Sequence, residues 1–264
     1  MTASFPTSIV RPSHPSIGLR WLVVALLLAG SPVAADAQER SWEPELWAGT
    51  GTALLGAFLL DTRLRVDLVE GVERPFESLS DAGNLLGRAQ TVVPALGVAY
   101  GVGRLAGNRE LSTATLHTAA ALTAAGAMNG LVKVGVGRRR PGVDNDPTSF
   151  RPVALDDHWQ SFPSGHTVVA FSLATAIAEE AKQPWVSALS YGAAGVVGWS
   201  RVYEDRHWAS DVVGGALIGT LSSKLTLRWL HSRAPHDGEA GAGRGAVHFA
   251  ILPRGFAVAI SPPR

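Results

Sequence analysis

The chain has 264 residues, of which 46% are hydrophobic and 17% are charged, and its formal net charge at pH 7 is +1. This length suits one domain with a sizeable core and leaves little room for two. A balanced charge argues against general nucleic-acid binding, which needs a basic face. The chain has no cysteine, so cysteine usage does not indicate the redox compartment in which it works.

Residues 1–37 have the pattern of an export signal. Arg11 and Arg20 precede the apolar run WLVVALLLAG, and the following VAADAQ offers small residues for cleavage before Gln38. The apolar run is shorter than the roughly 20 residues that cross a bilayer, which favours a signal over an uncleaved anchor. We therefore predict export to the cell envelope. Removal of two arginines and one aspartate would leave a formally neutral mature protein.

Residues 38–232 are predicted to form one mostly helical domain, because six stretches in it have helical periodicity or composition. Pro94 predicts a kink or a helix start in the second stretch, and Ser112 is the expected N-cap of the third. Many Ala and Gly residues favour close helix packing. The sequence thus predicts an all-α bundle of about six core helices. The six stretches are residues 45–72, 84–107, 112–137, 164–182, 184–199 and 208–231.

Two further segments complete the predicted organisation. Residues 138–163 are rich in proline and aspartate, which predicts a loop, and a loop this long inside a compact domain is usually functional. Residues 233–246 are small and charged, as in a flexible linker. Residues 247–264 alternate apolar residues around a Pro-Arg-Gly turn, which is typical either of a short β-hairpin or of an unordered tail.

A first basic cluster spans the end of the third predicted helix and the loop after it. Lys133 lies in the last helical turn and Arg140 in the loop, so both could reach one anion, and the guanidinium could bind two of its oxygens. Alone, this pattern also fits a solvated helix end.

A second cluster is FPSGHT, residues 162–167. Ser164 can cap the helix, Gly165 allows close backbone approach, and the helix begins at His166. Free N–H groups at a helix N-terminus suit an oxyanion such as phosphate. The same residues could form an ordinary N-cap turn, but that interpretation does not use His166.

A third cluster is SRVYEDRHWASD, residues 200–211. Arg201 ends one helix, His207 begins the next, and Asp211 follows one helical turn later, where its carboxylate can reach an imidazole nitrogen. A carboxylate on one nitrogen fixes the tautomer and makes the other nitrogen a better nucleophile. Alone, the spacing also fits a surface ion pair.

Together, the three clusters resemble the signature of the type 2 phosphatidic acid phosphatase superfamily, which also contains class A bacterial acid phosphatases and vanadium haloperoxidases. The signature reads K-x6-RP, PSGH and SR-x5-H-x3-D, and every fixed position is present in order between residues 133 and 211. The resemblance extends to the helical framework and not to the last 30 residues. It implies a phosphate cradle of Lys133, Arg140, Ser164, Gly165 and Arg201.

The resemblance also implies the roles of three catalytic residues. His207 attacks phosphorus and forms a phosphohistidine, Asp211 orients His207, and His166 protonates the leaving oxygen. No metal or other cofactor is expected, because the cationic side chains stabilise the charge of the transferring phosphoryl group.

Other charged residues are given a structural interpretation. Arg138 and Arg139 match no fixed position, and we interpret them as secondary attraction for an anionic substrate or as helix-end charges. The acidic residues and histidine of residues 156–160 are expected to form a solvated loop and not a metal site. His117, within an Ala-rich helix, is expected to be packed or capped by a neighbour. Residues 204–206 lie in the variable gap of the third cluster, where they could shape the route of the substrate.

The sequence therefore predicts metal-independent hydrolysis of a phosphomonoester or a lipid (pyro)phosphate in the cell envelope. A vanadium-dependent haloperoxidase and a phosphate-binding module are the alternatives. The partner is a phosphorylated small molecule or a phospholipid, and no nucleic acid. Hydropathy leaves both a periplasmic globular domain associated with the membrane and an integral membrane bundle open.

Overall fold

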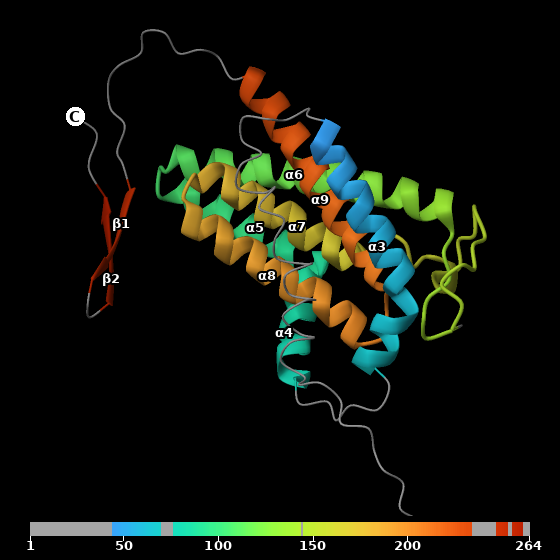
Figure 1. The fold of residues 1–264 in the computed structure, drawn as a ribbon. Coiled ribbons are helices and arrows are strands. Elements are labelled where there is room, and N and C mark those ends of the chain that lie inside the picture. Colours follow the sequence, from blue (N-terminus) through green and yellow to red (C-terminus); the bar gives the residue numbers. More distant parts are fainter. Residues whose placement is uncertain (1–43, 70–75, 144, 234–246, 253–254, 261–264) are drawn as a thin grey trace, which may run out of the picture.

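The computed structural model describes residues 44–69, 76–143, 145–233, 247–252 and 255–260 (Figure 1). The predicted export signal and nearly all of the predicted linker lie outside these residues. The prediction of an all-α bundle is confirmed. Its elements are α3 (Pro44–Val69), α4 (Glu77–Gly87), α5 (Ala89–Leu105), α6 (Arg109–Val136), the short 3-10 helix η1 (Asp157–Trp159), α7 (Gly165–Ala181), α8 (Pro184–Tyr203), α9 (Ala209–Arg233), β1 (Val247–Leu252) and β2 (Gly255–Ile260).

Helix α7 lies at the centre of the bundle and packs against α6, α8 and α9 (Figure 1). Helix α3 packs on α9, α4 on α8, and α5 on α6. The long connection between α6 and α7 contains η1, as expected for a loop at residues 138–163. The same end of the bundle therefore holds the end of α6, the start of α7, the end of α8 and the start of α9.

Glycines on α9 allow this helix to approach α7 closely. A Cβ on Gly215 would lie 2.7 Å from the carbonyl oxygen of Ser164, and one on Gly219 would lie 2.6 Å from that of Val168. These distances leave no room for a larger residue. Where α7 and α9 begin, the Ser164 amide donates a hydrogen bond of 3.0 Å to the Asp211 carbonyl oxygen. This bond holds the starts of the two helices together.

The stretch predicted as one helix at residues 84–107 is two helices. The chain is extended at Arg88, between α4 and α5, and Pro94 lies inside α5. The break follows Gly87, where a Cβ would lie 2.6 Å from Cγ1 of Val197 on α8. The end of α4 thus coincides with its close approach to α8, and Pro94 lies within α5 and does not mark a helix start.

The predicted N-cap of α6 is wrong. The helix begins at Arg109, and the Asn108 side chain caps it by accepting a hydrogen bond of 2.9 Å from the Leu111 amide. Ser112 lies within the first turn, where its hydroxyl donates to the Asn108 carbonyl oxygen.

The C-terminal hairpin that the sequence allowed is present. Strands β1 and β2 pair antiparallel, with Val247 opposite Ile260 and Leu252 opposite Gly255.

Helix α6 combines length with an apolar composition. In the described part of the chain it is the one helix long and apolar enough to cross a membrane, and only 17% of its most apolar window is buried. Helix α5 packs beside it. Their exposed apolar side chains are Val93, Val98, Val102 and Leu105 on α5, and Leu111, Leu116, Met128 and Leu131 on α6.

Candidate active site

The predicted site residues lie together at the end of the bundle where α6 and α8 end and α7 and α9 begin. Nη1 of Arg140 lies 3.4 Å from Nε2 of His207, and Nζ of Lys133 donates a hydrogen bond of 2.9 Å to the carbonyl oxygen of Pro163, next to Ser164. The charge of Arg201 acts directly on His166. Side chains from all three sequence clusters therefore lie close to one another at this end of the bundle.

His207 and Asp211 form the centre of this arrangement. Nδ1 of His207 lies 3.5 Å from Oδ2 of Asp211, and both side chains are buried. The same carboxylate oxygen accepts hydrogen bonds from the Trp208 amide at 2.9 Å and from the Ser161 hydroxyl at 2.5 Å. The imidazole thus presents Nδ1 to a fixed carboxylate and Nε2 to Arg140.

Arg138 holds the other side of Asp211. Its guanidinium donates 2.7 Å hydrogen bonds to Oδ1 of Asp211 and to Oδ2 of Asp61, and a further bond of 2.6 Å to the Ser210 hydroxyl. The residue is only 1% exposed. Our interpretation of Arg138 as secondary attraction for the substrate or as a helix-end charge is therefore wrong. Gly137 ends α6 with a φ of 58°, a left-handed conformation that favours glycine and turns the chain inward at this point.

Asp61 of α3 is a residue that sequence reasoning missed. Its carboxylate accepts hydrogen bonds from the amide and the hydroxyl of Ser210, at 2.9 and 2.6 Å, in addition to its ion pair with Arg138. The one available signal is an acidic residue directly after the apolar run LLGAFLL. Asp61 connects α3 to the start of α9 and so supports Asp211 indirectly.

Two cradle cations have partners that a substrate could replace. Arg140 pairs at 2.9 Å with Asp157, whose side chain is 80% exposed. Lys133 donates to the carbonyl oxygens of Gln160 and Pro163. Residues 156–160, expected to form a solvated loop, are thus largely exposed. The carboxylate of Asp157 nevertheless contacts Arg140 of the cradle.

The third cradle cation, Arg201, is nearly buried and bound to a carboxylate. Its Nη2 donates a 2.6 Å hydrogen bond to Oε2 of Glu204, whose other oxygen accepts from Ser80 and Asn84 of α4. Glu204, in the variable gap of the third cluster, therefore connects Arg201 to α4. Sequence reasoning missed both α4 residues, because neither belongs to a motif.

Ser164 and His166 begin α7. Ser164 occupies the N-cap position as predicted, but its side chain makes no capping hydrogen bond and instead accepts one of 2.9 Å from the Thr167 hydroxyl. His166 packs against Gly87 of α4, where a Cβ would lie 3.0 Å from Cβ of His166. The end of α4 therefore limits where the His166 ring can lie.

Burial determines the protonation of both histidines. It lowers the pKa of His207 to about 4 and outweighs the opposing effect of Asp211, and Lys133 and Arg140 add a smaller further lowering. Burial also lowers the pKa of His166 to about 4, together with the charge of Arg201. Both imidazoles are thus neutral at neutral pH, and a neutral imidazole has the free lone pair that a nucleophile needs.

Asp211 stays charged. Burial would raise the pKa of its carboxyl group, but the interaction with His207 and the charge of Arg138 outweigh burial and keep that pKa below the ordinary value.

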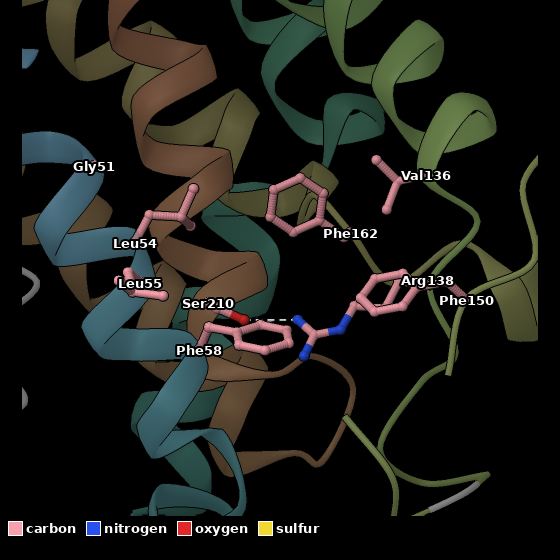
Figure 2. A pocket seen from close by; sticks show the side chains of 9 residues that line it. All are labelled: Gly51, Leu54, Leu55, Phe58, Val136, Arg138, Phe150, Phe162 and Ser210. Carbon is pink, nitrogen blue, oxygen red and sulfur yellow. Dashed lines mark hydrogen bonds between the residues drawn. The ribbon is translucent and has the colours of Figure 1, made fainter. Parts of the chain in front are cut away.

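An apolar pocket of about 340 Å³ lies on the far side of Arg138, between α3 and the α6–α7 connection (Figure 2). Figure 2 shows the Arg138 guanidinium reaching Ser210 beside the ring of Phe58. The guanidinium lies 5.0 Å from the centre of that ring and 5.7 Å from that of Phe150. The pocket's apolar lining includes Leu54, Leu55, Phe58, Val136, Phe150 and Phe162. An apolar group could therefore bind next to the residues that support Asp211.

The model of the PAP2 superfamily matches residues 114–235, the part of the chain that carries all three clusters. This region belongs to the PAP2 superfamily. The crystal structure of Aquifex aeolicus LpxE superimposes with a TM-score of 0.51 at 21% identity, over 64% of this chain and 95% of that one. It has the same helical fold. A transmembrane PAP2 type phosphatidylglycerolphosphate phosphatase from Bacillus subtilis gives a TM-score of 0.49 at 20% identity, over 82% and 96% of the two chains.

Two relatives match shorter stretches. The lipid A 1-phosphatase of Porphyromonas gingivalis is 46% identical over 67 residues, 25% of this chain and 15% of the relative. An Escherichia coli protein named for undecaprenyl-diphosphatase activity, YbjG, is 40% identical over 89 residues, 33% of this chain and 43% of the relative. The match thus spans less than half of either relative.

Proposed function

We propose that the protein is a metal-independent PAP2 phosphatase that hydrolyses a lipid phosphate or pyrophosphate through a phosphohistidine on His207. The observation that carries the proposal is the neutral, buried imidazole of His207, placed between the carboxylate of Asp211 and the guanidinium of Arg140. A site for phosphate binding alone needs neither a second histidine nor a carboxylate behind the first.

In the first half-reaction, the phosphoryl oxygens replace the present partners of Arg140 and Arg201, and Lys133 adds a third positive charge. Nε2 of His207 attacks phosphorus. The N–P bond forms as the bond from phosphorus to the leaving oxygen breaks, and His166 gives its proton to that oxygen. The charge of the bound phosphoryl group favours the protonated form of His166, which burial and the cradle cations otherwise disfavour.

In the second half-reaction, the now neutral His166 takes a proton from water, and the resulting hydroxide attacks phosphorus. The N–P bond breaks, inorganic phosphate leaves, and His166 gives to solvent the proton that it took up when the substrate bound, so both imidazoles are neutral again. Asp211 keeps Nδ1 of His207 protonated and oriented throughout, so Nε2 remains the reacting nitrogen.

Three observations support a lipid as the substrate. Two relatives that match are named as a lipid A 1-phosphatase and for undecaprenyl-diphosphatase activity. An apolar pocket lies beside the residues that support Asp211. The exposed side chains of α5 and α6 form an apolar face that suits a bilayer. We therefore propose that α5 and α6 embed the protein in the membrane of the cell envelope, after export directed by residues 1–37.

The haloperoxidase alternative is not favoured, because both relatives are named as phosphatases. On the phosphatase proposal, vanadate acts as an inhibitor that resembles the transition state.

A hydrolysis panel tests the proposed activity. The purified protein is given lipid phosphates, lipid pyrophosphates and water-soluble phosphate esters in mixed micelles with a chelator present, and released phosphate is measured. We expect turnover of a lipid substrate that the chelator does not abolish. A brief reaction with ³²P-labelled lipid, quenched in alkali, should leave acid-labile label on His207. Dependence on an added metal, or peroxide-driven halide oxidation without phosphate release, would overturn the proposal.

Fractionation tests the membrane location. If α5 and α6 lie in a bilayer, alkaline carbonate should leave the protein in the membrane fraction, and detergent should release it. Release by carbonate alone would favour a periplasmic domain.

A further inference from the structure

A second cluster of reactive side chains lies at the opposite end of the bundle. His117 on α6, Glu180 on α7 and His231 on α9 lie together, and their candidate ligand atoms are all within 4.8 Å of one another. His117 precedes Lys133 by sixteen residues on the same helix, a rise of about 24 Å. The cluster is therefore separate from the active site, although it joins three of the helices that build it.

The distances in this cluster are those of a metal site. Oε1 of Glu180 lies 3.3 Å from Nδ1 of His117 and 3.4 Å from Nε2 of His231. With metal–ligand bonds of about 2.0–2.1 Å, two ligands of a tetrahedral zinc ion lie about 3.3 Å apart. Two of the three distances between candidate ligand atoms, those from Glu180 to the two histidines, already have this value. The third can close by rotation of His231, whose side chain is 46% exposed near the end of α9.

The surroundings of Glu180 also fit a site that a cation can occupy. The preceding Glu179 has Lys224 at 3.9 Å, whereas the described part of the chain gives Glu180 no lysine or arginine as an ion-pair partner. The two imidazole rings are inclined at 67°, with centres 5.2 Å apart, and the nitrogens of both rings face one carboxylate oxygen. The side chains are partly exposed, and His231, near the end of α9, is the most exposed of the three, so an ion can reach the cluster.

From this geometry we infer that His117, Glu180 and His231 bind one divalent transition-metal ion, with Zn²⁺ as the representative ion and water in the fourth position. Two imidazoles and one carboxylate suit Zn²⁺, Ni²⁺ or Cu²⁺, whereas Mg²⁺ and Ca²⁺ prefer sites made of oxygen alone. The bound ion connects α6, α7 and α9 and stabilises the folded protein by mass action. It takes no part in phosphoryl transfer, which occurs at the other end of these helices.

Metal titration of the full-length, untagged protein in detergent tests the inference. After treatment with a chelator and its removal, Co²⁺ is added and its visible absorption followed, and Zn²⁺ is then used as competitor. We expect one ion per chain, the intense visible bands of tetrahedral Co²⁺, and loss of these bands on addition of Zn²⁺. Zn²⁺ should also raise the melting temperature.

Single substitutions then locate the site. Glu180→Gln and His117→Gln should each weaken binding at least tenfold and remove the rise in melting temperature. Glu179→Gln is the matched control on the same helix and should bind as tightly as the unchanged protein. His231→Gln lies near an exposed helix end, so it tests the site even if His117→Gln does not fold.

Two results would overturn the inference. One is the absence of saturable binding of one ion per chain. The other is unchanged affinity in Glu180→Gln or His231→Gln, in which case the cluster is only a network of ion pairs. The readouts are binding and melting, so this test does not depend on the proposed phosphatase activity.

Discussion

Two groups of charged residues share the active-site end of the bundle and differ in how their charge is balanced. The support layer consists of Arg138, Asp61 and Asp211, all buried and paired with one another. The cations of the phosphate cradle are Lys133, Arg140 and Arg201, whose partners are main-chain oxygens and partly exposed carboxylates. Two arginines only two residues apart thus have opposite roles. Arg138 is a fixed part of the protein, whereas Arg140 is available to a ligand.

The physical reason for this difference is desolvation. A buried ion pair costs several kcal/mol when one partner is removed, because the other charge remains buried without compensation. The exposed pair of Arg140 with Asp157 contributes only about 0–1 kcal/mol, so an incoming phosphate can replace Asp157 at little cost, whereas Glu204 holds the nearly buried Arg201 more firmly. We therefore expect substitutions in the support layer to affect stability first, and substitutions in the cradle to affect substrate binding and turnover first.

The largest expected effect is on the reacting residue that lies between the two groups. His207→Ala removes the nucleophile, so kcat/KM should fall by about 10³-fold or more, while melting changes little. Phosphate release from a lipid substrate measures the loss, and His158→Ala, an exposed histidine of the α6–α7 connection, is the control. Activity within tenfold of the unchanged protein in His207→Ala would show that another residue attacks phosphorus.

The next effect is on stability. Arg138→Met leaves Asp61 and Asp211 buried without their cation, and should cost about 3–5 kcal/mol of unfolding free energy. Thermal unfolding in detergent measures it. Adding Asp61→Asn to this variant removes one of the uncompensated charges and should restore part of the lost stability. If Arg138→Met has the same melting temperature as the unchanged protein, the stability of the support layer does not depend on this pairing.

The contrast between the two arginines also explains what the sequence could and could not predict. Lys133, Arg140 and Arg201 are recognisable because the spacing of fixed motif positions places them, and the structure brings them together. The support layer is different. Asp61 lies far from the motifs in sequence, and its contact with Arg138 arises only because α3 packs against the start of α9. No local pattern encodes that contact.

The fold shows the same limit. Helical periodicity predicted the bundle and most of its helices, because amphipathic and small-residue patterns are local. The break between α4 and α5 was missed, since it coincides with a long-range contact, that of Gly87 with Val197 on α8. The cluster of His117, Glu180 and His231 was missed for the same reason, because three helices distant in sequence supply one residue each.

Within the cradle, Arg140→Lys should separate binding from stability. Lysine keeps the charge but loses the planar fork that can bind two phosphoryl oxygens, so we expect kcat/KM to fall about 10–100-fold. The melting temperature should stay within about 2 °C of that of the unchanged protein, because Asp157 is exposed. Arg104→Lys, at the exposed end of α5, is the matched control. A large loss of stability in Arg140→Lys would place this arginine in the support layer.

The smallest expected effect concerns the carboxylate that occupies Arg201. Glu204 binds this guanidinium at 2.6 Å, so a phosphate must compete with it. Glu204→Gln removes the competing charge, while its side-chain carbonyl can still accept from Ser80 and Asn84. Because the Glu204 side chain is 23% exposed, we expect inorganic phosphate to inhibit about 2–5-fold more tightly. Asp205→Asn changes the net charge equally, but this carboxylate pairs with Arg65, so phosphate inhibition should not change. Weaker inhibition of Glu204→Gln by phosphate would show instead that Glu204 holds Arg201 in the position that binds phosphate, which would make Glu204 a positioning residue of the cradle.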